Sequence, residues 1–131
     1  MIKYIRIFYE TFLVNYYLKK YEFGYVKEMY NEKYGNLKLS KNVDDEEINL
    51  LLKKIDKVCF WFMGNAQCLH RSLIGFKLLR QHGLPVQLVV GVRKFPFSSH
   101  AWVESENNVI NDVQGVKETY TEVFRIGEAN S

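Results

Sequence analysis

Apolar residues in the first half of the chain recur at the three- and four-residue spacing of amphipathic helices. A first helix is predicted from the stripe Ile5, Phe8, Tyr9, Phe12, Leu13 and Tyr16. A second helix is predicted over Tyr25–Tyr34, ending at Gly35, with a loop or short extended piece over Asn36–Asn42. A third begins near Asp44 or Asp45 and carries the stripe Ile48, Leu51, Leu52, Ile55, Cys59 and Phe62. These helices are interpreted as scaffold or as a partner surface, and a core-facing stripe is favoured over a cofactor site.

The segment after residue 64 has both start and stop signals of a helix. Asn65 is a favourable N-cap, which places Gln67 and Cys68 at the second and third helical positions. At the other end Gly83 suits the first position beyond the helix, and Pro85 prevents continuation. Cys68 is therefore predicted in the first turn of a helix.

One side of this helix is predicted to pack closely against another layer. Ser72, Gly75 and Leu79 follow Cys68 at spacings of four, three and four residues, so all four share a side. The small Ser72 and Gly75 would allow close approach, which puts the thiol beside the predicted sheet.

The residue pattern in the second half of the chain is typical of short strands and turns. Three strands are predicted over Val86–Val92, His100–Glu104 and Val109–Asp112, with Arg93–Ser99 as a connection around Pro96. The third is antiparallel to the second across turn residues 106–108, and Tyr120–Ile126 is a last strand or a short tail. The fold class is α+β: N-terminal helices, then a helix packed on a small antiparallel sheet.

Composition and charge narrow the class of protein. The chain has 131 residues, of which 47% are hydrophobic and 25% charged, as in a single folded domain. We divide it into a helical part, residues 1–60, and a core, residues 61–131. The net charge of +3 is too mild to indicate nucleic acid or membrane binding. No apolar run could span a membrane, the N-terminus lacks signal-peptide features, and two cysteines exclude a disulfide scaffold. A cytoplasmic protein with reduced thiols is expected.

Three residues have the chemistry of a nucleophilic site. A helix N-terminus lowers the pKa of a thiol, and Cys68 is placed for that effect. His100 begins one predicted strand and Asp112 ends its antiparallel neighbour, so these two ends lie side by side. A thiolate, a histidine and a carboxylate that orients the histidine are the groups used in acyl transfer.

The residues around these three resemble the lasso-peptide leader peptidases of the transglutaminase-like superfamily. The resemblance covers about half of the chain, from Phe62 to Arg125. Its motifs, in chain order, are CLHRSL at Cys68–Leu73, GLPV at Gly83–Val86, VGVR at Val90–Arg93, HAWVE at His100–Glu104, and Asp112.

The resemblance implies a transglutaminase-like, papain-like core and a cysteine endopeptidase with the triad Cys68, His100 and Asp112. Its substrate would be a lasso-peptide precursor, and its partners a separate leader-recognition protein and the macrolactam-forming cyclase. No cofactor, metal, nucleic acid or membrane insertion is expected. The alternatives are a non-catalytic leader-binding module of the chaperone kind and a transglutaminase-like acyltransferase.

Two further residues are candidates for binding the oxyanion or the substrate. The backbone N–H of Cys68 would meet the oxyanion, and the Gln67 side chain either joins it or faces solvent. Arg71 either binds a substrate carboxylate or phosphate or is an exposed helix residue.

Several other polar or reactive residues are interpreted as structural. Cys59 is taken as a small buried hydrophobe. His70 lies two positions from Cys68, about 160° around the helix, so it is assigned to the surface or to helix packing and not to a shared metal site. Asn111 is an alternative polar partner beside Asp112.

Two aromatic features complete the sequence picture. Trp102 is interpreted as facing away from His100, into the core. Residues Tyr16–Tyr21 combine aromatic and basic side chains. They form either a docking surface for the recognition protein or a solvated amphipathic face.

Overall fold

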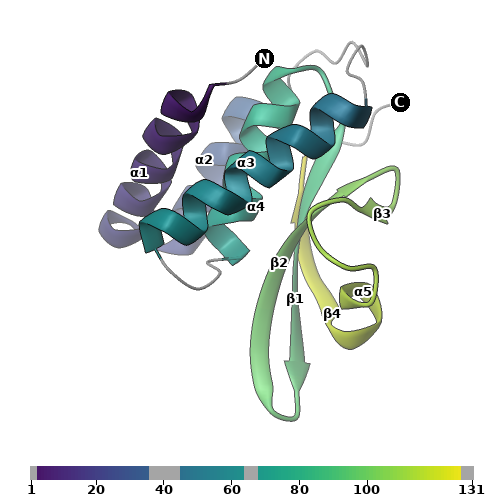
Figure 1. Ribbon diagram of the computed structural model, residues 1–131. Helices are drawn as coiled ribbons and strands as arrows, with labels where there is room; N and C mark the ends of the chain where they lie inside the picture. Colours follow the sequence, from purple (N-terminus) through teal and green to yellow (C-terminus); the bar gives the residue numbers. More distant parts are fainter. Residues whose placement is uncertain (1–2, 36–44, 64–67, 128–131) are drawn as a thin grey trace.

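The computed structural model describes residues 3–35, 45–63 and 68–127. Within these ranges the chain forms two consecutive blocks, a helical one followed by a mostly β one (Figure 1). The elements are α1 (Tyr4–Lys20), α2 (Phe23–Tyr34), α3 (Asp45–Met63), α4 (Cys68–Gln81), β1 (Val86–Lys94), β2 (Phe97–Ser105), β3 (Asn108–Val109), α5 (Val116–Thr119) and β4 (Thr121–Ile126). The α+β fold class is confirmed.

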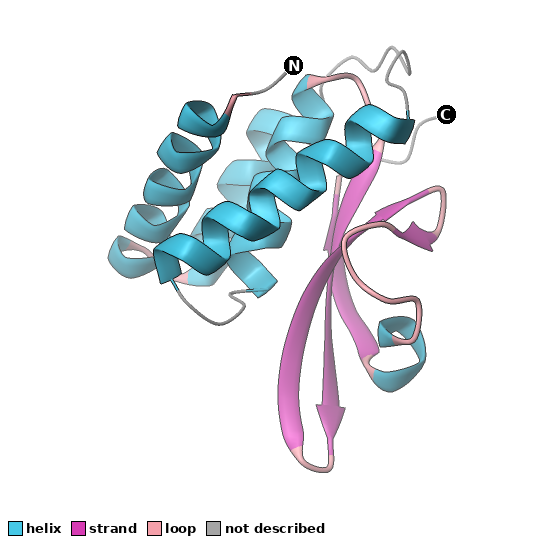
Figure 2. Ribbon diagram, in the orientation of Figure 1, coloured by secondary structure: helices cyan, strands magenta, loops and turns pink. Residues whose placement is uncertain are grey.

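The four strands form one antiparallel sheet in the order β3-β2-β1-β4. β1 and β2 make a long hairpin whose pairs run from Val86↔Ser105 to Lys94↔Phe97. Figure 2 shows this hairpin reaching well past the helices. β4 returns to the free edge of β1, so the predicted final segment is a strand.

The predicted connection over Arg93–Ser99 is wrong. Both strands continue through these residues and leave only Phe95 and Pro96 for the turn. Proline lacks an N–H for a strand ladder, but at the end of a hairpin no ladder bond is required of it.

The third strand is shorter than predicted and starts one residue earlier. After Val109, the N–H of Ile110 still donates to Val103. The N–H of Val103 is then taken by the side chain of Asn111 instead of a backbone carbonyl. Pairing stops there, so Asp112 lies in the loop beyond β3 and not at the end of a strand.

Helix α4 is the centre of the molecule. Residues 72–80 of α4 are all buried, between α1, α2 and α3 and the face of the sheet that carries Ala101 and Val103. A Cβ at Gly75 would lie 3.7 Å from Leu52 and 3.8 Å from Val103, so this position is enclosed by α3 and β2. The predicted close approach of this side of the helix is confirmed.

The orientation of α1 differs from the prediction. The apolar stripe predicted to face the core is largely exposed, and the buried residues are Ile7, Glu10, Thr11 and Val14. The cause is an ion pair: the Glu10 carboxylate accepts from Lys77 Nζ of α4 at 2.7 Å and from Arg6 Nε at 2.9 Å. A buried carboxylate needs such partners. The polar contact therefore sets which side of α1 faces inward.

Candidate functional site

Cys68 is the first residue of the described part of α4 and is half-buried. Its thiol lies close enough to the His100 imidazole and the backbone N–H of Ala101 for both groups to stabilise the thiolate. Burial by itself raises the pKa of this thiol, but these two contacts and the charges of His100 and Arg71 outweigh burial, so the pKa is lowered. A thiol with a lowered pKa beside an imidazole is chemically a nucleophile poised for activation.

The other side of the His100 ring is held by a carboxylate. His100 Nε2 lies 2.6 Å from Asp112 Oδ2, and each side chain is 21% exposed. This contact leaves Nδ1 as the ring nitrogen for the thiol. The contact with Cys68 raises the pKa of His100 against the opposing effect of burial, and the bond with Asp112 raises it further.

The carboxylate itself is fixed by its own loop. The backbone N–H of Val113 donates to Asp112 Oδ1 at 2.8 Å, so the two carboxylate oxygens have separate partners. The structure thus brings Cys68, His100 and Asp112 together in one connected chain of side chains.

An aromatic frame surrounds the imidazole. The Tyr120 ring stacks on His100 at 5.2 Å between centroids, and the Trp102 ring is near-parallel to it at 6.1 Å. The interpretation that Trp102 faces away from His100 is wrong, because residues two positions apart on a strand share a face. Trp102 is nevertheless buried, as predicted, in a small cluster on the side of the sheet opposite α4, formed by Val89, Trp102, Val109 and Val116.

Tyr120 was not among the residues predicted for the site. Its ring lies over His100, and its hydroxyl is 3.4 Å from Ser98 Oγ. The residue sits just before β4, at a position that the sequence pattern marks only as the start of a strand. Only the pairing of β4 with β1 brings it over His100.

Asn111 has a different task from Asp112. Its Nδ2 donates to Ser72 Oγ at 3.0 Å, and its Oδ1 accepts from the N–H of Val103 at 2.8 Å. Asn111 therefore ties the loop that bears Asp112 to the helix that bears Cys68.

Arg71 lies at the rim of the site. Its side chain is 16% exposed, so the reading as an exposed helix residue is wrong. Nη1 donates to Asp56 at 3.0 Å, and Nη2 is 3.9 Å from Asp112 Oδ2. Arg71 thus joins α3 to the carboxylate that holds His100.

The remaining predicted residues either pack among the helices or lie outside the described residues. Cys59 is buried, and burial raises the pKa of its thiol to about 11, which confirms it as a buried hydrophobe. His70 is half-buried, and burial is the main cause that lowers its pKa; helix packing is the fitting description. The predicted N-cap Asn65 and the oxyanion candidate Gln67 lie outside the described residues.

Two comparisons with known proteins agree with this geometry. The family model described as Transglutaminase-like superfamily matches residues 31–125. The chain belongs to the transglutaminase-like superfamily. It is also similar to the microcin J25-processing protein McjB of Escherichia coli, with 31% identity over 95 residues that make up 70% of this chain and 46% of that protein. The chain thus spans about half the length of this relative. No solved structure gave a significant match.

These matches confirm the family resemblance drawn from the motif residues. The family match contains Cys68, His100 and Asp112. It begins at residue 31, so α1 and most of α2 precede it.

Proposed function

We propose that this chain is a cysteine endopeptidase that removes the leader from a lasso-peptide precursor. The observation that carries the proposal is the connected arrangement of Cys68, His100 and Asp112, in which the pKa of the thiol is lowered and the imidazole is held at 2.6 Å by a carboxylate. The similarity to a protein named for microcin J25 processing supports the substrate class.

In the first half of the reaction the leader is transferred to the enzyme. The Cys68 thiolate attacks the carbonyl carbon of the last leader residue and forms a C–S bond. His100, as imidazolium, gives its proton to the amine of the core peptide as the C–N bond breaks. Asp112 holds the ring and stabilises the imidazolium. The product of this step is a thioester, with the core peptide released.

In the second half water replaces the core peptide. Neutral His100 takes a proton from water, whose oxygen attacks the thioester carbonyl. The C–S bond breaks, the thiolate is restored, and the leader leaves with a free carboxylate. In both halves the backbone N–H of Cys68 is the proposed donor to the oxyanion, since first-turn N–H groups have no intrahelical partner.

The proposed setting is a cytoplasmic maturation pathway. A separate leader-recognition protein presents the precursor, and a cyclase closes the macrolactam ring after the leader has been removed. The released α-amine of the core peptide is the group that such a ring closure consumes, which fixes the order of the two steps.

The test is cleavage of a precursor peptide by purified protein together with the recognition protein. Cys68→Ala is expected to abolish leader release, whereas Cys59→Ala, which changes the other thiol, retains it. Undiminished release by Cys68→Ala would remove this thiol from the mechanism. Mass spectrometry of the leader separates the alternatives: a free carboxylate indicates hydrolysis and an added amine indicates acyl transfer. Binding without any cleavage by the wild type indicates a leader-binding module.

A further inference from the structure

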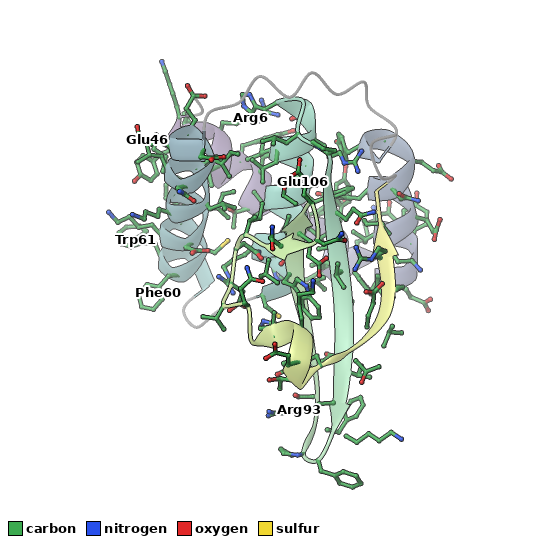
Figure 3. All side chains as sticks on the ribbon, turned by 90° about the vertical axis from the view of Figure 1, so that its right-hand side faces the viewer. Arg6, Glu46, Phe60, Trp61, Arg93 and Glu106 are labelled. Atoms are coloured by element: carbon green, nitrogen blue, oxygen red, sulfur yellow. The ribbon has the colours of Figure 1, made fainter. Side chains whose placement is uncertain are left out.

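Helices α1 and α3 present a continuous exposed surface of large apolar side chains. Several of these side chains are mostly exposed, with Ile5 at 77%, Phe12 at 62% and Trp61 at 79%. We call this surface the aromatic face and define it as Tyr4, Ile5, Phe8, Phe12 and Tyr16 of α1 with Trp61 of α3. Figure 3 shows Trp61 projecting outward from its helix. An apolar patch of this kind on a folded protein marks an interaction site.

The aromatic face is held outward by the core. The opposite side of α1 carries Glu10, whose carboxylate is bonded to Lys77 of α4. Turning α1 to bury its aromatic residues would break this ion pair and leave a buried charge unpaired. The exposure of the aromatic face therefore follows from the packing of α1 on α4 and does not reflect loose packing of α1.

The face contains two wide, open hollows. One, of about 320 Å³, is lined by Tyr4, Phe8, Lys57, Val58 and Trp61. The other, of about 520 Å³, is lined by Phe12, Asn15, Tyr16, Lys19 and Lys20. The α1 residues of both hollows recur at spacings of three and four, so they follow one stripe of the helix. Such a stripe suits a partner that inserts large side chains at successive helical turns.

The charged residues that line the two hollows are all lysines. Lys57 lines one hollow and Lys19 and Lys20 line the other, and no carboxylate lines either hollow within the described ranges. The Glu10 carboxylate is buried on the reverse side of α1, and Asp56 of α3 is bonded to Arg71 beside the site. A complementary surface therefore carries Asp or Glu around its apolar side chains. A second copy of this chain fits poorly, because a symmetric contact would place lysines against lysines.

We propose that the aromatic face docks a partner protein that presents large apolar side chains flanked by carboxylates. This inference rests on the proposed function, in which that partner is the separate leader-recognition protein. Trp61 precedes Cys68 by seven residues along the chain. A partner docked on α1 and the end of α3 is thus held on the helix that leads to the proposed nucleophile.

The test measures binding of the purified chain to the recombinant leader-recognition protein encoded with the precursor, loaded with synthetic leader peptide. Phe12→Glu and Trp61→Glu are each expected to weaken binding at least about tenfold. The matched control is Phe95→Glu, which changes an even more exposed aromatic at the hairpin turn, 92% exposed, and should bind like the wild type. The double variant Lys19→Glu, Lys57→Glu should weaken binding and flatten its dependence on salt.

Three results would overturn the proposal. The first is equal binding by all variants, which would place the interface elsewhere. The second is no binding by the wild type. The third is self-association or membrane binding through the same face. It would be seen as a concentration-dependent dimer in ultracentrifugation, or as co-sedimentation with vesicles of phosphatidylglycerol and phosphatidylcholine, and Trp61→Glu would abolish it. Cys68 alkylation at the wild-type rate shows that a variant is folded at the site. Precursor cleavage at high enzyme concentration tests the proposed function separately, since a face variant should still cleave there.

Discussion

Replacing Asp112 by Asn should raise the pH at which Cys68 becomes reactive. The substitution keeps the shape of the side chain and removes the negative charge that lies 2.6 Å from His100 Nε2. Without that charge the imidazolium is less stable, and the thiolate that depends on the imidazolium is less stable with it. The pKa of Cys68 should therefore rise.

The contact sets the size of this shift. A hydrogen bond between an imidazolium and a carboxylate contributes about 1.5–3 kcal/mol, which corresponds to about one to two pH units. Both side chains are 21% exposed, and Arg71 Nη2 lies 3.9 Å from the same carboxylate oxygen. Solvent and the guanidinium already offset part of the carboxylate charge, so the lower end, about one pH unit, is expected.

The assay is the rate of iodoacetamide alkylation between pH 5 and 10, read at each cysteine by peptide mass spectrometry. Cys59 is the internal reference, because it is buried and the pKa of its thiol is about 11. Asp56→Asn is the matched control, since it removes a carboxylate that contacts Arg71 and not the imidazole. A midpoint for Cys68 that stays within about 0.3 pH units of the wild type, or moves down, would refute the electrostatic reasoning.

Three further predictions concern neighbouring features. Arg71→Met should shift the same alkylation midpoint upward by less than Asp112→Asn does, because the charge of Arg71 also lowers the thiol pKa; a larger shift would contradict the ranking. Lys77→Met should lower the free energy of unfolding by about 1.5–3 kcal/mol in urea titrations, since it removes one of the two cations bonded to the buried carboxylate of Glu10 and leaves Arg6; a second change of Glu10 to Gln should restore part of the loss. Gly127→Ala should lower the melting temperature, because φ of Gly127 is +95° and a Cβ there would lie 2.7 Å from a guanidinium nitrogen of Arg80. Its control is Gly24→Ala, which should be neutral or stabilising because a Cβ at Gly24 would have nothing within 4 Å.

The sequence predicted the parts of the fold that local patterns control. The C-terminal end of α4 is an example, since Gly83 and Pro85 mark the stop, and the helix ends at Gln81. The strand over Val86–Val92 is likewise present, because a β-branched apolar run suits a central strand. Cys68, His100 and Asp112 also come together, but not at strand ends as predicted: His100 lies within β2, paired with Gly91, and Asp112 lies in the loop beyond β3.

The errors arose where a distant partner overrides the local pattern. The apolar stripe of α1 gives no sign that Glu10 will be buried, because its partner Lys77 is 67 residues away. The length of β3 depends on the Asn111 side chain replacing a backbone acceptor. Tyr120 reaches His100 only through the pairing of β4 with β1. The orientation of Trp102 was a different kind of error, in which the two-residue period of a strand was misapplied.

The ion pair beneath α1 also bears on how the chain can be shortened. The region matched by the family model starts at residue 31, so a chain cut there would keep the whole matched region. Such a fragment would lack Glu10, so the ammonium of Lys77 on α4 would lose its carboxylate partner and keep the Tyr34 ring beside it. Helix α1 is thus part of the packing around α4, and a fragment without it is expected to be less stable than the whole chain.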